Sequence, residues 1–210
     1  MWKIGSSMQI REVRVSDAQS VLDLMYQLDR ESKFMMLEEG ERNTTLEQQV
    51  KILESFSESD SKVMFVILSE QEVCGFVAGI GNTANRNRHS MYCVMGIKQS
   101  ASGSGYGKQL LKHLENWALE HEFTRLELTV MCHNDRAFNL YQKQGFEVEG
   151  TKRNSLNVDG RYVDEFYMSK TAPHLTNNLR VIQHAWHFWF GFSLVFTAVK
   201  LSVVVACFTP

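Results

Sequence analysis

A glycine-rich segment between a predicted strand and a predicted helix constrains this fold more than any other feature of the sequence. Gly103, Gly105 and Gly107 alternate with other residues between the apolar run 90–98 and the amphipathic run 107–123. Alternate glycines let the backbone turn so that several N–H groups converge without interference from Cβ atoms. The first turn of the following helix adds unpaired N–H groups and the positive end of the helix dipole. The segment is therefore suited to bind an anion such as phosphate.

Two common phosphate-binding loops do not fit this segment. No Gly-Lys-Ser or Gly-Lys-Thr sequence follows at the spacing of a Walker loop. The dinucleotide-binding fingerprint is also a poor fit, because the glycines come after several strands of antiparallel type rather than near the start of a βαβ unit. A tight glycine turn without a ligand is an interpretation that the spacing alone leaves open.

Hydrophobic periodicity on both sides of the segment predicts a mixed α/β domain. Ser16 with Gln19, and Thr44 with Glu47, have the spacing of a capping box and predict the starts of the first two helices. The expected strands are 8–15, 62–68, 73–80, 90–98, 125–131, 151–158 and 161–169, and the expected later helices are 107–123 and 134–145. The resulting order is β-α-α-β-β-β-α-β-α-β-β.

The composition is that of a soluble globular protein in a reducing compartment. The chain has 210 residues, of which 44% are hydrophobic and 22% are charged, close to the averages for globular domains. A net charge of −2 without a dense run of Lys and Arg argues against nucleic acid as a partner. The N-terminus has no secretory signal, so we expect a cytoplasmic protein. Free thiols and no metal site are expected from four widely spaced cysteines, Cys74, Cys93, Cys132 and Cys207.

A change in composition near residue 170 divides the chain. We expect an extension at residues 1–7, one folded domain at 8–170 and an apolar tail at 171–210. The tail has no acidic residue, and its run 185–208 is long enough to span a bilayer of about 30 Å, although Lys200 interrupts it. Three interpretations stay open: a segment without function, a membrane anchor, or a contact between copies in a homodimer. The first is favoured over membrane contact, because the domain looks complete before the tail begins.

A second motif covers residues 134–146. Asn134 is expected to cap a helix that ends at Gly145, and Tyr141 lies about two turns after the cap. Taken alone, Tyr141 is expected to be a half-buried core residue. This motif alone does not indicate a function, but its combination with the glycine segment does.

Together the two motifs resemble the GNAT superfamily of acyl-CoA-dependent N-acyltransferases over residues 8–170. The run 97–107 follows the coenzyme A loop of that family position by position, except at two residues, and 134–146 follows its later motif throughout. The family usually has Arg or Gln where this chain has Ser102, and Pro where it has Gln99. The end of the domain looks like the branch with bacterial L-amino-acid and ribosomal-protein acetyltransferases. Without the arginine one side-chain contact to phosphate is missing, so we expect weaker cofactor binding.

The resemblance implies a fold, a reaction and a set of site residues. The implied fold is a central, mostly antiparallel, twisted sheet of about seven strands flanked by helices, with a V-shaped splay between the fourth and fifth strands. The implied reaction transfers an acetyl group from acetyl-CoA, as co-substrate and without a metal, to a primary amine that attacks the thioester directly. Tyr141 would protonate the leaving thiolate and Glu31 is a candidate general base. The implied cofactor-binding residues are Met95, Ile97, Ser102, Gly103, Ser104, Gly105, Tyr106, Gly107, Lys108, Asn134 and Tyr141.

The acceptor is the least determined part of the prediction. A small amine such as an amino acid is the leading hypothesis, and Phe34, Met35 and Met36 are expected to form part of the wall of its site. Acetylation of a protein N-terminus or lysine by the same fold is a second hypothesis. A non-catalytic acyl-CoA sensor is a third, supported by Ser102 and opposed by the intact Asn134 and Tyr141.

Overall fold

The computed structural model describes residues 8–171 as seven strands and four helices in the predicted order. The extension 1–7 and all of the predicted tail except Thr171 lie outside the described residues. The strands are β1 (Met8–Glu12), β2 (Lys62–Ser69), β3 (Glu72–Gly81), β4 (Ser90–Ile97), β5 (Arg125–Met131), β6 (Glu147–Val158) and β7 (Arg161–Thr171). The helices are α1 (Ala18–Glu31), α2 (Leu46–Ser57), α3 (Tyr106–Glu120) and α4 (Asp135–Lys143), with short 3₁₀ turns at Val15–Asp17 and Gln99–Ala101.

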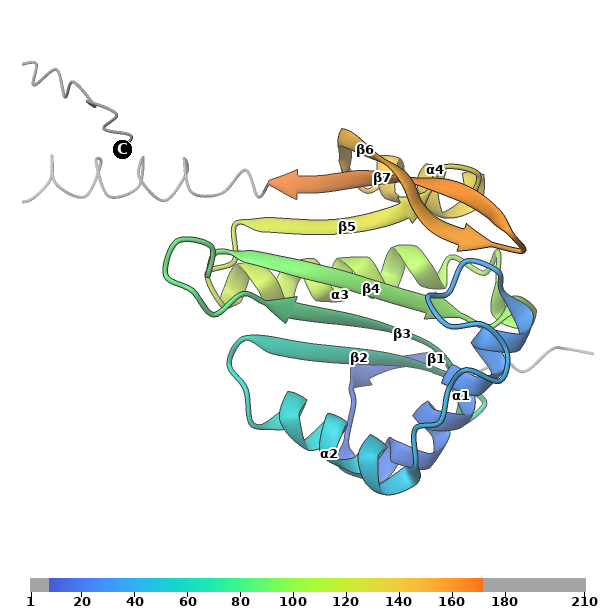
Figure 1. Ribbon diagram of the computed structural model, residues 1–210. Helices are drawn as coiled ribbons and strands as arrows, with labels where there is room; N and C mark the ends of the chain where they lie inside the picture. The colour runs from blue at the N-terminus through green and yellow to red at the C-terminus, as the bar shows by residue number, and fades with distance from the viewer. Residues whose placement is uncertain (1–7, 172–210) are drawn as a thin grey trace, which may run out of the picture. The chain divides into compact units, whose positions relative to one another are not determined.

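All seven strands form one sheet in the order β1-β2-β3-β4-β5-β7-β6. Neighbouring strands are antiparallel except β4 and β5, which are parallel. That pair is in register over only three positions, from Ser90 opposite Arg125 to Tyr92 opposite Glu127. Beyond them the two strands draw apart, as Figure 1 shows. The predicted mixed sheet with a splay between the fourth and fifth strands is confirmed.

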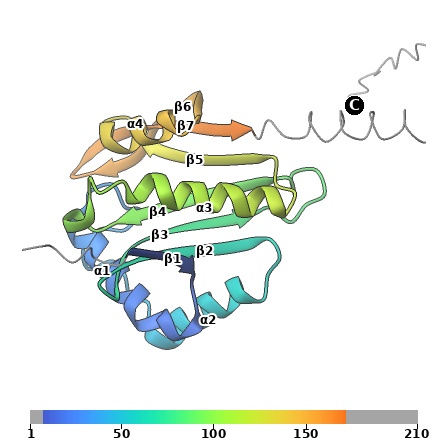
Figure 2. The same ribbon diagram turned by 180° about the vertical axis from the view of Figure 1, so that it is seen from behind.

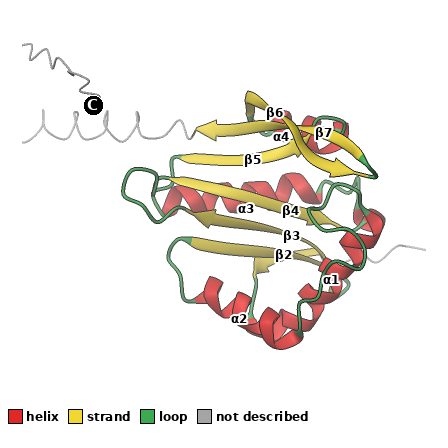
Figure 3. Cartoon of the chain, viewed as in Figure 1, coloured by secondary structure: helices red, strands yellow, loops and turns green. Residues whose placement is uncertain are grey.

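Helices cover both faces of the sheet and produce two apolar clusters. Figure 2 shows α3 lying across one face, and α1 and α2 pack from the other side. Figure 3 shows the same arrangement by type of element, with the strands between the helices. The cluster under α3 includes Met91, Leu110, Leu114 and Met168, all fully buried. The cluster under α1 and α2 includes Val21, Leu24, Val66 and Phe76. Within residues 8–171, no helix combines the length and apolar character needed to cross a bilayer.

The predicted start of the first helix was wrong. A 3₁₀ turn occupies Val15–Asp17, and α1 begins at Ala18 without a side-chain cap. The carboxylate of Asp17 instead accepts the N–H of Arg14 at 2.8 Å and pairs with the guanidinium of Arg11. An ion pair between strand and turn therefore fixes this corner, and the predicted spacing of Ser16 and Gln19 has no part in it.

The second capping box was predicted one residue too early. Thr45 caps α2, its hydroxyl accepting the N–H of Gln48 at 3.3 Å, while the Gln48 side chain accepts the N–H of Thr45 at 2.9 Å. Adjacent threonines followed by Glu47 and Gln48 offered two equivalent registers, and the apolar face of the helix selects the later one. Other bounds also moved: β1 ends at Glu12, α3 covers Tyr106–Glu120, and β6 begins at Glu147.

Candidate active site

The glycine loop lies between the 3₁₀ turn and α3 and presents unpaired N–H groups. Gly103 has φ +85° and Gly105, which caps α3, has φ +79°. Both lie in the left-handed region that residues with a Cβ rarely adopt. Among the described residues, no hydrogen bond uses the N–H groups of 103–108. These donors and the positive end of the α3 dipole face the same space.

The loop has room for a ligand as well as donors for it. Gly105 is exposed, and a Cβ placed on it would have nothing within 4 Å. At Gly107 a Cβ would lie 2.7 Å from Cδ2 of Leu140, so this glycine lets α4 approach α3. Both glycines were predicted to bind the cofactor, and Gly107 has a packing role in addition. The backbone donors, the open space and the positive end of the α3 dipole fit a phosphate group.

The edge of β4 that faces β5 continues from the loop. Lys98 donates its N–H to the carbonyl of Cys74 on β3, so backbone groups at even-numbered positions of β4 point toward β3. Those of Met95 and Ile97 therefore point toward β5, which has no residue in register with them. This edge can pair with an extended ligand in the way a strand would.

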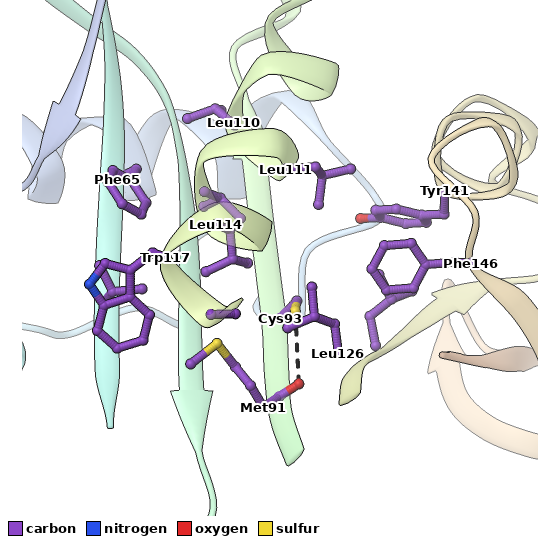
Figure 4. Close-up of a cluster of buried hydrophobic side chains, with 14 of the residues drawn as sticks. Phe65, Met91, Cys93, Leu110, Leu111, Leu114, Trp117, Leu126, Tyr141 and Phe146 are labelled. Carbon is purple, nitrogen blue, oxygen red and sulfur yellow. Dashed lines mark hydrogen bonds between the residues drawn. The ribbon is translucent and has the colours of Figure 1, made fainter. Parts of the chain in front are cut away.

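The motif on α4 places one polar and one aromatic side chain near this edge. The Asn134 side-chain oxygen accepts the N–H of Ala137 at 3.2 Å and caps α4, which confirms its predicted capping role. Within residues 8–171 the Asn134 side-chain amide donates no hydrogen bond and is available to a ligand. Tyr141 is 8% exposed, and its ring packs against Phe146 with the oxygen turned away from α4 (Figure 4). Burial, and then the nearby Cys93 thiol and Tyr92 phenol of β4, raise the pKa of Tyr141.

Comparison with known proteins agrees with this arrangement. Residues 22–146, more than half of the chain, match the acetyltransferase (GNAT) family. The chain belongs to the GNAT family. Its resemblance to that family over the loop and the α4 motif is confirmed.

Several relatives and solved structures resemble this member of the GNAT family. The L-amino acid N-acetyltransferase AaaT of Escherichia coli is 34% identical over 73 residues, 35% of this chain and 43% of that protein. The ribosomal protein uS5-alanine N-acetyltransferase of Escherichia coli is 29% identical over 51% of this chain and 55% of that protein. The matches thus span about half the length of these relatives.

The solved structures cover more of the fold. A GNAT acetyltransferase of Streptococcus pneumoniae superposes with a TM-score of 0.76 and 26% identity over 79% of this chain and 99% of that one. The structure of YncA from Salmonella typhimurium with its cofactor acetyl-CoA superposes with a TM-score of 0.71 and 16% identity, covering 78% and 93% of the two chains.

Glu31, predicted as a candidate base, lies at the last position of α1 and contacts the loop region. Its carboxylate accepts the backbone N–H of Gln99 at 2.8 Å and the side-chain amide of Gln27 at 2.5 Å. These hydrogen bonds, that of Gln99 first, lower the pKa of Glu31. A lowered pKa makes this carboxylate a weaker base than an ordinary glutamate. The contact with Gln99 gives Glu31 a role in positioning the loop region, and its role as general base stays a prediction.

A polar network that was not predicted from the sequence lies on the sheet face opposite α3, where β4 and β5 part. The hydroxyls of Tyr92, the last paired residue of β4, and Thr129, two residues after the last paired residue of β5, lie 2.9 Å apart and connect the two strands. Glu127 accepts the phenol of Tyr167 at 2.6 Å and Nε of Arg125 at 3.0 Å. The alternation in β5 indicated that these residues share one face. It could not reveal their partners on β4 and β7.

The segment between α1 and α2 lies over the same side of the sheet. Lys33 pairs with Asp159 in the turn between β6 and β7. The ring of Phe34 lies 5.3 Å from the ring of His133, which follows β5. Phe34 was predicted to line the acceptor site, and these contacts place it beside the C-terminal end of β5. The segment thus covers part of the region next to the splay, as Figure 1 shows in blue.

Proposed function

We propose that this acetyltransferase moves the acetyl group of acetyl-CoA to the primary amine of a small molecule such as an amino acid. The observation that carries the proposal is the continuity of the loop donors, the unpaired edge of β4 and the Tyr141 phenol. Acetyl-CoA presents three parts to these groups in the same order. Its phosphates need the loop donors, its extended arm needs the edge of β4, and its leaving sulfur needs the phenol. The bound acetyl-CoA supplies an activated thioester.

Each group has a defined part in this proposal. The N–H groups of 103–108 hold the pyrophosphate, and the backbone of Met95 and Ile97 pairs with the pantetheine arm. A backbone N–H of β4 steadies the thioester oxygen while the amine nitrogen bonds to the acetyl carbon, a contribution of about 3 kcal/mol for a well-placed donor. Asn134 donates its amide to the arm. Tyr141 donates its hydroxyl proton to the sulfur as the C–S bond breaks, so that coenzyme A leaves as the thiol. The proton that the amine nitrogen gives up passes to water, from which the phenol regains its own.

The position of the 32–45 segment supports a small acceptor. Its ion pair with Asp159 and the ring contact of Phe34 with His133 narrow the approach to the splay. A free amine can pass such an opening more easily than the surface of a folded protein. The partial match to an L-amino acid N-acetyltransferase is consistent with this acceptor.

An acetyl-CoA consumption assay tests the proposal. The full chain is incubated with acetyl-CoA and, in turn, with free amino acids, polyamines, aminoglycosides and peptides with free N-termini. We expect turnover with at least one free amino acid and little turnover with the peptides. Turnover restricted to peptides would support the protein-acetylating alternative. Tight acetyl-CoA binding without turnover on any amine would support the sensor.

Gly105→Ala tests the role of the loop separately. The Cβ meets no protein atom, but it occupies the space in front of the loop donors and strains a residue at φ +79°. We expect the Kd for acetyl-CoA to rise at least tenfold, about 1.4 kcal/mol, while circular dichroism shows a folded protein. Gly160→Ala, in the exposed turn between β6 and β7 with φ +75°, is the matched control. Equal affinity in both variants would show that the loop does not hold the cofactor.

A further inference from the structure

The phosphate loop of this chain is short of positive charge. The residue before its first glycine is Ser102, which is neutral. Within residues 102–108 the only cationic side chain is Lys108, which is exposed on the first turn of α3. A pyrophosphate at this loop would therefore depend mainly on backbone donors unless another element contributes a cation.

Arg136, the second residue of α4, lies beside the loop. A Cβ placed on Gly103 would be 3.6 Å from Nη2 of Arg136, so the guanidinium borders the first glycine. Arg136 is exposed, and within the described part of the chain it forms no ion pair with a carboxylate. The adjacent Asp135 does not pair with it. The guanidinium donors are thus uncommitted at the edge of the loop.

The position of Arg136 in its helix is unfavourable for stability. It lies in the first turn of α4, where the helix dipole is positive and a cation is repelled. A cation at such a position with no acidic partner does not stabilise the helix. Its presence there is better explained by binding to an anionic ligand. A planar guanidinium next to a phosphate loop can donate two parallel hydrogen bonds to phosphate oxygens.

We propose that Arg136 binds the pyrophosphate of acetyl-CoA and supplies from α4 the cation that the loop lacks at Ser102. The inference rests on the proposed acetyl-CoA site and adds a side chain from a different element to it. In this proposal Arg136 contacts the pyrophosphate of the cofactor and does not contact the acceptor amine. Its loss therefore weakens cofactor binding for every acceptor alike.

Calorimetry on the full-length protein tests this assignment. We expect Arg136→Gln to raise the Kd for acetyl-CoA about tenfold and Arg136→Lys to raise it less, because the charge is kept and the planar fork is lost. The difference between wild type and Arg136→Gln should shrink as salt is added. Lys143→Gln, at the other end of α4, makes the same change of charge and should leave the Kd unchanged. The melting temperature of Arg136→Gln should stay the same or rise slightly, because the cation opposes the dipole.

Two further titrations identify the contact. Dephospho-CoA lacks the 3′-phosphate and keeps the pyrophosphate, so the Arg136→Gln effect should be as large with it as with CoA. Loss of the effect would overturn the pyrophosphate assignment in favour of the 3′-phosphate. In a double-mutant cycle, Ser102→Arg should tighten binding more in the Arg136→Gln background than in wild type, because the two cations then replace each other. Additive effects would show that they do not share a ligand.

Failure of this inference can be separated from failure of the proposed function. If wild type binds acetyl-CoA and Arg136→Gln binds it equally well, only the role of Arg136 is wrong. If wild type does not bind acetyl-CoA, the proposed function fails first.

Discussion

Tyr141 combines two environments that a core tyrosine alone would not need. Its ring packs among apolar side chains, and its oxygen lies near Cys93 and Tyr92, beside the splay. Burial raises its pKa, so the phenol keeps its proton well above neutral pH. A protonated phenol beside the splay is suited to donate a hydrogen bond to a sulfur that is gaining negative charge.

The Tyr141→Phe variant separates this role from packing. The ring and its contacts stay and only the hydroxyl is lost, so we expect kcat to fall about 10²-fold, within the range for general acid catalysis. The Kd for acetyl-CoA and the melting temperature should change little, because the hydroxyl acts on the transition state. Tyr162→Phe, at a largely exposed position of β7, is the control. A variant with wild-type kcat and a lowered melting temperature would show that the Tyr141 hydroxyl contributes to stability and not to catalysis.

At the scale of elements, a hydrogen bond connects the loop region to α1. It lies at Gln99, one of the two positions where the chain differs from the family pattern. Gln99 begins the 3₁₀ turn and has an N–H, which a proline at that position would lack. The Glu31 carboxylate at the end of α1 accepts this N–H. α1 also packs close to β4, since a Cβ on Gly96 would lie 2.6 Å from Cδ1 of Leu28. The hydrogen bond between Glu31 and Gln99 therefore joins α1, which precedes the 32–45 segment, to the start of the phosphate loop.

Two variants distinguish this positioning role from base catalysis. Glu31→Gln keeps a weaker acceptor, and we expect it to raise the Kd for acetyl-CoA about threefold, because this hydrogen bond is exposed and contributes little. Gln99→Pro removes the N–H at the first position of the turn, after an extended Lys98, where proline is tolerated. In the Gln99→Pro background, Glu31→Gln should have almost no further effect on the Kd. A large loss of kcat at unchanged Kd in both backgrounds would instead make Glu31 the base.

The two motifs could be predicted from the sequence because each is a continuous stretch with a local cause. Glycines that need positive φ and an asparagine cap determine their own backbone, and the structure confirms both. Contacts between elements could not be predicted in this way. The approach of Arg136 to Gly103 and of Glu31 to Gln99 depends on how α4 and α1 lie against the sheet, and no spacing along the chain encodes that.

On the scale of the whole molecule, the sheet with a helix layer on each face keeps titratable groups of β4 inside the protein. Cys93 is 6% exposed and lies in the cluster under α3, beside Met91 and Tyr141 (Figure 4). Burial raises the pKa of this thiol to about 12. The ordinary pKa of a cysteine thiol, which applies in the unfolded chain, is 9.0. The folded state therefore keeps a proton that the unfolded state loses between these two values.

This difference predicts that stability falls on the alkaline side. Between about pH 9 and pH 12 the unfolded state binds fewer protons than the native state, so the free energy of unfolding decreases as pH rises. At pH 10.5 the Cys93 share amounts to about 2 kcal/mol, because each unit of difference is worth about 1.4 kcal/mol. Urea unfolding under reducing conditions at pH 8 and pH 10.5 measures it. Cys93→Ala should start less stable because of the cavity that it leaves, but it should lose about 2 kcal/mol less than wild type between the two pH values. Equal losses in both proteins would mean that the thiol ionises in the native state, and that the sheet and α3 do not shield β4 from water.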